Sequence, residues 1–263
     1  MLTSLRLLGY QLEDVRRSRG VLAFALVLLG TTELLVRFGG GGPRVALSLM
    51  SVVLLPLPLV SLLFGTIYLY NSRDFVELLL AQPVTRSRLF TALYLGLAVP
   101  LAAGLAAAVL LPLAWHSALD RATAGAIGTL VGAGVLLVFV FTSIAFLLAV
   151  SIEDRARGLG AAVLVWLLAT LLYDGAVLAG IAAFDEYPLE GPLIVVSLLN
   201  PVDLARVLLL LQLDTAALLG YTGAVFERFF GTVQGVAVSL AALTVWAVVP
   251  WWLARRRFAR KDF

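Results

Sequence analysis

Six long apolar stretches alternate with short polar segments along the chain. The stretches run approximately over Gly20–Val36, Ala46–Tyr70, Thr91–Trp115, Ala124–Val150, Leu159–Phe184 and Thr232–Leu253. A helix needs about 20 mostly apolar residues to cross the hydrocarbon core of a bilayer. The pattern therefore predicts an all-α integral membrane protein with six transmembrane helices, in a single transmembrane domain that spans residues 1–263.

The segment before the first stretch has a helical pattern of its own. Leu5, Leu8, Leu12 and Val15 recur at spacings that place them on one helical face, and charged residues occupy the remainder. This amphipathic pattern predicts a helix over residues 1–19 that lies in the membrane interface. A charged tail without a helix stays open as the alternative.

The loop at residues 71–90 is the most distinctive polar segment. Asn71 or Ser72 can cap a helix, and Asp74 then lies in a first turn that favours acidic side chains. The helix is expected to end before Pro83, because proline disfavours helical geometry in the residue that precedes it. The sequence therefore predicts a short surface helix between the second and third spans.

One face of this short helix carries Phe75, Leu78 and Leu79, and Thr85 is expected to cap the helix that follows. Two rigid elements joined by a proline break can transmit force between the membrane and a partner in the cytoplasm. From the pattern alone, an ordinary solvated loop is an equally good interpretation.

The basic residues predict the orientation. With the N-terminus in the cytoplasm, 14 of the 19 Lys and Arg residues fall on cytoplasmic segments, among them the basic tail at residues 254–263. The positive-inside rule therefore favours cytoplasmic termini. The loop at residues 151–158 then lies on the same side, and its charged residues Glu153, Asp154 and Arg155 are expected to touch the same partner.

A long segment at residues 185–231 is expected on the outer side. Asn200-Pro201 is a turn signal, and the leucine-rich run after Asp203 is too short to cross a bilayer. It suits a helix at the membrane surface or a re-entrant segment. Asn200, Pro201, Asp203 and Arg206 are therefore candidates for an outer docking surface or a gate. A seventh span is the remaining alternative, but it would place the basic tail outside.

Two acidic residues lie at membrane depth. Asp174 falls inside the fifth span and Glu33 in the outer half of the first, so each carboxylate should face protein or water rather than lipid. For Asp174 a proton or substrate contact and a structural bond stay equally open, whereas a bond to neighbouring helices is favoured for Glu33. His116 is interpreted as an interfacial polar residue. Gly128 and Gly132 form a Gly-x-x-x-Gly step that predicts close helix contact.

Composition excludes several classes of protein. Hydrophobic residues make up 62% of the chain and charged residues 13%, which excludes a soluble globular domain. The chain has no Cys and one His, so thiolate metal sites and disulfides are absent. Its single Lys, Lys261, lies near the end, so no phosphate-binding loop ends in Gly-Lys-Ser/Thr. We expect neither an enzyme nor a nucleic-acid-binding protein.

Three stretches resemble a known family. Glu77-Leu78-Leu79-Leu80 followed by Gln82-Pro83-Val84-Thr85-Arg86 is similar to the coupling loop of type-2 ABC transporter permeases. LLNPVDLARVL at residues 198–208 and SIEDRARGLGAAVLVWLLATLLYD at residues 151–174 resemble, within that family, the permeases of nitrous oxide reductase maturation systems.

The resemblance implies a homodimer of permeases in the inner membrane, bound to two cytoplasmic ATPase subunits, with lipid around it and a periplasmic partner outside. ATP and Mg²⁺ would bind the ATPase, so no cofactor is expected in this chain. The implied function is work that supports assembly of a copper–sulfur centre. A type-2 exporter of a drug, lipid or glycan and a proton-driven transporter that uses Asp174 remain alternatives. The residues implied to contact the ATPase are Ser72, Arg73, Asp74, Phe75, Glu77, Leu78, Pro83, Arg86, Glu153, Asp154 and Arg155.

Overall fold

The computed structural model describes residues 19–39, 42–80, 85–116, 121–184, 190–212 and 229–261. Helices make up nearly all of these residues, and no strand occurs among them, so the predicted all-α fold is confirmed. The predicted interfacial helix over residues 1–19, apart from Arg19, lies outside the described residues.

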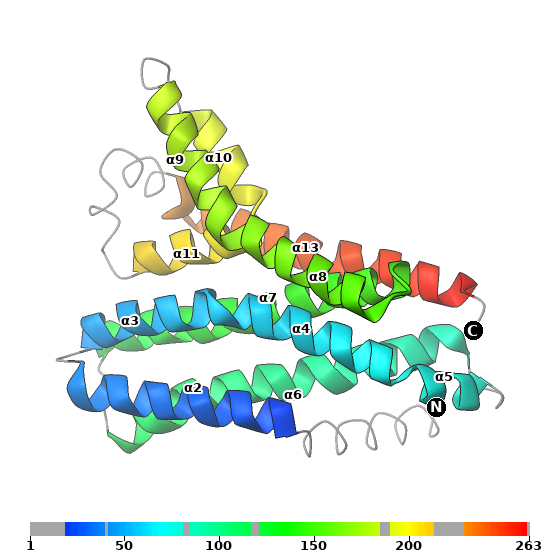
Figure 1. The fold of residues 1–263 in the computed structure, drawn as a ribbon. Coiled ribbons are helices and arrows are strands. Elements are labelled where there is room, and N and C mark those ends of the chain that lie inside the picture. The colour runs from blue at the N-terminus through cyan, green and yellow to red at the C-terminus, as the bar shows by residue number, and fades with distance from the viewer. Residues whose placement is uncertain are drawn as a thin grey trace.

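The helices follow one another through the described ranges (Figure 1). Their bounds are α2 Arg19–Phe38, α3 Gly42–Leu54, α4 Pro56–Asn71, α5 Arg73–Leu80, α6 Arg86–Trp115, α7 Arg121–Ser151, α8 Arg155–Leu167, the π-helical turn η1 Leu168–Leu172, α9 Tyr173–Ala183, α10 Glu190–Leu198, α11 Pro201–Gln212 and α13 Val233–Arg260.

The six predicted spans are confirmed in position, with differences at their ends. The third span begins at Arg86 instead of Thr91, and the sixth continues to Arg260 instead of ending at Leu253. Arginine is a good helix former, and its long side chain reaches the polar interface while its backbone continues the helix. Most of the segment predicted as a basic tail is therefore the last two turns of α13.

In two spans the regular α-helix is interrupted. The second span is divided into α3 and α4 at Leu55, because Pro56 has no N–H to donate and therefore occupies the first turn of the new helix. The fifth span contains the five-residue π-helical turn η1 between α8 and α9. Sequence periodicity predicted neither interruption.

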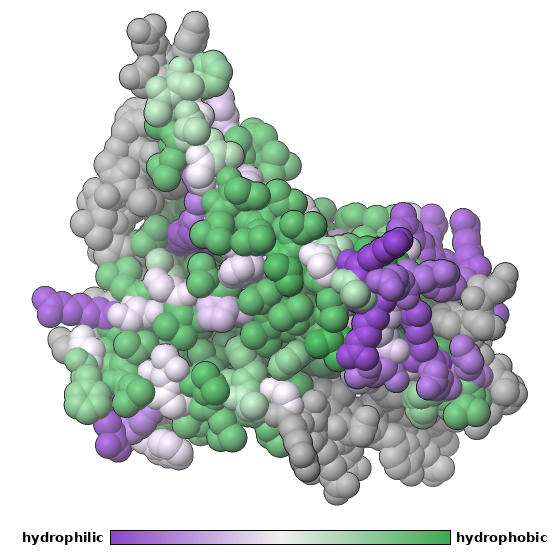
Figure 2. Space-filling view, viewed as in Figure 1, coloured by the Kyte–Doolittle hydropathy of each residue, from purple (hydrophilic) through white to green (hydrophobic). Residues whose placement is uncertain are grey.

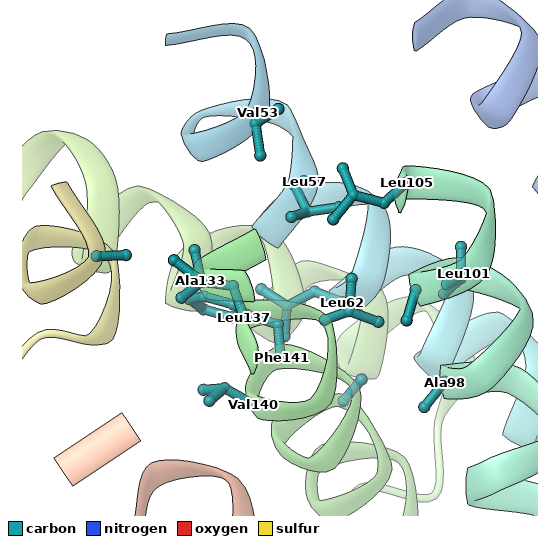
Figure 3. Close-up of a cluster of buried hydrophobic side chains, with 14 of the residues drawn as sticks. Val53, Leu57, Leu62, Ala98, Leu101, Leu105, Ala133, Leu137, Val140 and Phe141 are labelled. Carbon is teal, nitrogen blue, oxygen red and sulfur yellow. The ribbon is translucent and has the colours of Figure 1, made fainter. Parts of the chain in front are cut away.

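The core lies around α7. This helix packs against α4, α6 and α13, and 67% of its most apolar 18-residue stretch is buried inside the chain. Figure 3 shows leucine, valine, alanine and phenylalanine side chains of α4, α6 and α7 in contact, with Leu62, Leu101, Leu137 and Phe141 among them. On the far side of α6, α2 completes this part of the bundle.

The close contact predicted at Gly128 and Gly132 is not present among the described residues of this chain. A Cβ added at either residue would meet no atom within 4 Å in the part of the chain that the structure describes. The close approach lies elsewhere: a Cβ at Gly65 would come 2.6 Å from the Cβ of Ala145. A lone glycine opposite an alanine permits this contact between α4 and α7, and no glycine repeat marks it.

Three spans are little covered by the rest of the chain. In the most apolar 18-residue stretch of each, 11% of the fifth span and 17% of the first and of the sixth are buried inside the chain. Figure 2 shows the bundle covered by hydrophobic residues along its length, with hydrophilic residues gathered at the end where α13 finishes. Apolar side chains can face lipid at no cost in hydration, so these three spans suit a membrane or a second protein chain.

Candidate functional site

The short helix α5 leaves the bundle at Ser72. The backbone N–H and the hydroxyl of Ser72 both donate to the carbonyl of Tyr68, at 3.0 and 2.7 Å, and these bonds end α4. Val76 is 1% exposed and anchors α5 to the bundle, whereas Phe75 and Leu78 are 43% and 71% exposed. The predicted surface helix is therefore present, with two large apolar side chains turned outward.

Two acids complete this surface. Asp74 and Glu77 are exposed one turn apart on the same short helix as Phe75 and Leu78. We call these four residues the coupling face. An apolar pair flanked by carboxylates is a surface that a partner protein with basic and apolar side chains can cover. Pro83, which was expected to end this loop, lies outside the described residues.

The base of α5 is tied to the second loop of the same end. The hydroxyl of Tyr70 donates to the carbonyls of Ile152 and Asp154, at 2.8 and 3.3 Å. The Arg73 guanidinium lies 4.5 Å from the centre of the Tyr70 ring and donates to the Ile152 carbonyl at 3.5 Å. A Cβ at Gly158 would lie 2.0 Å from the Tyr70 hydroxyl, so only glycine fits there.

The three charged residues of the second loop have different environments. Asp154 is the N-cap of α8, because its Oδ1 accepts from the backbone N–H of Arg157 at 2.7 Å. Glu153 is 84% exposed and lies 3.7 Å from the ammonium group of Lys261. Arg155 is exposed. Glu153 and Arg155 are therefore placed at the surface, whereas the side chain of Asp154 stabilises a helix end.

Arg86 holds the end of α13. Its Nη1 donates to the carbonyl of Lys261 at 2.7 Å and to that of Ala259 at 3.4 Å. Lys261 in turn donates to the carbonyl of Val150 at 3.3 Å, and Arg257 donates to the hydroxyl of Ser151. Two loops and the chain end therefore form one bonded unit, which sequence reasoning missed because a carbonyl acceptor leaves no sequence signal.

At the opposite end, Asp174 is paired with Arg206. Nη1 of Arg206 lies 2.8 Å from Oδ2 of Asp174 and 3.6 Å from Oδ1 of Asp203. The side chains of Arg206 and Asp174 are 30% and 36% exposed. Sequence reasoning named all three residues but did not predict that one arginine would bridge an acid of the fifth span to an acid of the outer segment.

Asn200 makes a second link between these elements. Its Oδ1 accepts from the N–H of Val202 at 2.9 Å, and Pro201 follows it at the first position of α11, so Asn200 caps that helix. Its Nδ2 donates to the carbonyl of Ala169 at 2.7 Å. Ala169 belongs to η1, and a π-helical turn displaces backbone carbonyls from the ordinary ladder.

The outer helices turn back on themselves. The axes of α10 and α11 are bent by 116° at the break between Leu198 and Pro201. With 12 residues, α11 is about 18 Å long, which is too short to cross the hydrocarbon core. A helix pair bent in this way is either a broken span or a re-entrant segment, and the re-entrant segment is one of the two interpretations that the sequence favoured.

Glu33 lies in a separate cluster. Its Oε1 is 2.8 Å from Nε of Arg37 and 2.9 Å from Nε2 of His116, which joins α2 to the end of α6. The bonded carboxylate expected for this position is therefore present, with His116 as its partner on the neighbouring helix.

A cavity of about 330 Å³ lies between α7, α11 and the beginning of α13. Its lining is mainly apolar, with Thr129 and Gln212 as polar exceptions. No group of three His, Cys, Asp or Glu residues with the geometry of a metal site occurs in the described ranges. The polar chemistry of the described part lies in the bonded unit at one end of the molecule, in the Asp174–Arg206 pair and in the Glu33 cluster.

Comparison with known proteins identifies the family. Residues 57–263 match the model of the family described as ABC-2 family transporter protein. The chain is also 28% identical over 267 residues to the probable ABC transporter permease protein NosY of Pseudomonas aeruginosa, across 95% of this chain and 96% of that protein. The resemblance to type-2 ABC transporter permeases is thereby confirmed. The chain belongs to the ABC-2 family of transporter proteins and is a multi-pass transmembrane permease subunit of an ABC transporter.

Proposed function

We propose that two copies of this permease act with two cytoplasmic ATPase subunits in the maturation of the copper–sulfur centre of nitrous oxide reductase. Similarity to NosY along nearly the whole of both chains is the observation that carries the proposal. The ATPase binds ATP and Mg²⁺, and the permease converts closure of the ATPase into movement. The complex lies in the inner membrane with both termini of the permease in the cytoplasm, in agreement with the placement of its basic residues.

The coupling face is the contact for the ATPase in this proposal. Exposed Phe75 and Leu78 lie outside the membrane spans, at the end of the molecule where α13 finishes in basic residues. Apolar side chains that protrude into water are favourable only when a partner covers them. Glu77 and Asp74 supply charge complementarity at the rim of the same contact.

The bonded unit at this end extends the effect of the ATPase beyond α5. Movement of α5 displaces Tyr70 and Arg73, and these side chains hold the loop that precedes α8. The fifth span begins with α8 and carries Ala169 and Asp174, which hold the re-entrant helices. A push at the coupling face therefore reaches α10 and α11, which in this proposal face a periplasmic partner.

The partners are tested by affinity purification of the detergent-solubilised chain from its native membrane, followed by mass spectrometry. Recovery of a P-loop ATPase together with a periplasmic protein supports the maturation role. Recovery of the ATPase alone favours a type-2 exporter of a drug, lipid or glycan. If no ATPase is recovered under gentle conditions, the proposal is wrong.

The coupling face is tested by Phe75→Asp. A charged residue in the centre of an apolar contact is expected to weaken ATPase binding about tenfold, which corresponds to about 1.4 kcal/mol. The measurement is the affinity of the purified ATPase for the reconstituted permease. The matched control is Phe38→Asp, since Phe38 is 80% exposed and lies at the end of the first span that is remote from α5. Equal ATPase affinity for both variants would exclude α5 as the contact.

The maturation role itself is tested by complementation. The chain is expressed in a strain that lacks the permease of its own maturation system, and nitrous oxide reductase is then purified. We expect the absorption spectrum of the copper–sulfur centre to return with the wild-type chain. If the complex with the ATPase forms but the spectrum does not return, the chain still acts as an ABC permease, and its role in the maturation of nitrous oxide reductase is rejected.

A further inference from the structure

The lipid-facing side of α13 ends in an unusual arrangement of tryptophan and arginine. Val245, Val249 and Trp252 are 57%, 47% and 41% exposed, and with Arg256 they follow one another at spacings of four, three and four residues. This spacing places all four on one helical face. An apolar stripe along the span therefore leads directly to a cation.

The side chain of Arg256 is turned back towards the transmembrane part of α13. The Arg256 guanidinium lies 3.6 Å from the centre of the Trp252 ring, and Arg255 lies 5.3 Å from the ring of Trp251. Tryptophan side chains in membrane proteins prefer the depth of the lipid headgroups. Stacking on Trp252 therefore fixes the charge of Arg256 near the depth at which phospholipid phosphates lie.

These cations have no anionic partner within the described part of the chain. Lys261 is paired with Glu153, and Arg257 binds Ser151, but no carboxylate lies within 4 Å of Arg255, Arg256 or Arg260 among the described residues. Figure 2 shows hydrophilic residues gathered at this end, beside hydrophobic residues of the spans. Among the described residues nothing therefore neutralises these three cations, and an anionic ligand can bind them.

We propose that Arg256 and Trp252 form a binding site for an anionic phospholipid, with its phosphate on the guanidinium and an acyl chain along Val249 and Val245. The charge and the apolar stripe match the two parts of such a lipid, and neither a soluble anion nor a neutral lipid matches both. Basic residues near a membrane surface contribute about 1 kcal/mol each to anionic lipid binding, which is about fivefold in affinity. The site is independent of the maturation role.

The site is tested by mass spectrometry of the intact detergent-solubilised protein during titration with phosphatidylglycerol or phosphatidylcholine. Phosphatidylglycerol is expected to bind at least fivefold more tightly. Arg256→Gln is expected to reduce this preference about fivefold, whereas Arg256→Lys retains most of it because the charge remains. Arg44→Gln is the matched control, since Arg44 is an exposed arginine in the first turn of α3 and the first residue of the second span, at the opposite end of the bundle.

Several outcomes would overturn the proposal. One is equal binding of the two lipids by the wild-type protein, and another is an equal loss of preference in Arg256→Gln and Arg44→Gln. Inhibition by inorganic phosphate as strong as that by phosphatidylglycerol would show an anion site without a role for the apolar stripe. Loss of lipid binding upon addition of the ATPase, or upon dimerisation of the chain, would assign the surface to that protein.

Discussion

Replacement of Gly158 by alanine is expected to abolish stimulation of the ATPase by the permease. The new Cβ would lie 2.0 Å from the hydroxyl and 2.8 Å from ring carbons of Tyr70, which is 7% exposed. The ring must move, and its bonds to the carbonyls of Ile152 and Asp154 are then lost. Overpacking and two lost hydrogen bonds together cost about 3 kcal/mol. ATP hydrolysis by the complex in lipid vesicles measures the effect.

Gly160→Ala is the matched control in the same helix. A Cβ at Gly160 meets no atom within 4 Å among the described residues, so this variant should retain wild-type stimulation. Tyr70→Phe removes the hydroxyl without adding bulk and is expected to have a partial effect. If Gly158→Ala assembles with the ATPase and is stimulated normally, the tie between α5 and the fifth span does not transmit movement.

The spans and the short helix α5 were predictable because they depend on local properties of the sequence. Runs of apolar residues predicted the spans, and α5 begins at Arg73 with Asp74 in its first turn as expected, but the Ser72 hydroxyl donates to the Tyr68 carbonyl at the end of α4 instead of capping α5. The predicted end of the sixth span was wrong because arginine is compatible both with a helix and with an irregular tail. Asn200-Pro201 was identified as a turn, and the structure shows the same pair as a helix cap.

The links between distant segments were not predictable. Tyr70, Arg86 and Asn200 bind carbonyl groups at Ile152, Lys261 and Ala169, and every residue has a carbonyl group, so the acceptors carry no recognisable residue type. The pairing of Asp174 with Arg206 uses recognisable residues, but it depends on a bend in the outer segment that the sequence left open. Candidate residues were therefore easier to find than their partners.

The Asp174–Arg206 pair is expected to respond unequally to removal of its two members. Arg206→Gln leaves the carboxylates of Asp174 and Asp203 together without their shared cation. An uncompensated carboxylate at membrane depth costs about 3 kcal/mol, so this variant should unfold at a markedly lower temperature and lose maturation activity. Asp174→Asn leaves Arg206 beside Asp203 at 3.6 Å and should be much milder. Thermal unfolding in detergent compares the two.

The same pair of variants separates the structural role of Asp174 from a role in proton transport. A proton carrier must ionise, so Asp174→Asn would abolish function in a protein that still folds. An anchor for the outer helices needs only a hydrogen-bond acceptor for Arg206, which the asparagine amide supplies. Arg37→Gln serves as the control, because the Arg37–Glu33 pair has a cation that is 60% exposed, and an exposed ion pair contributes little to stability. A stable but inactive Asp174→Asn protein would therefore assign proton transport to this residue, and an active one would establish it as part of the outer anchor.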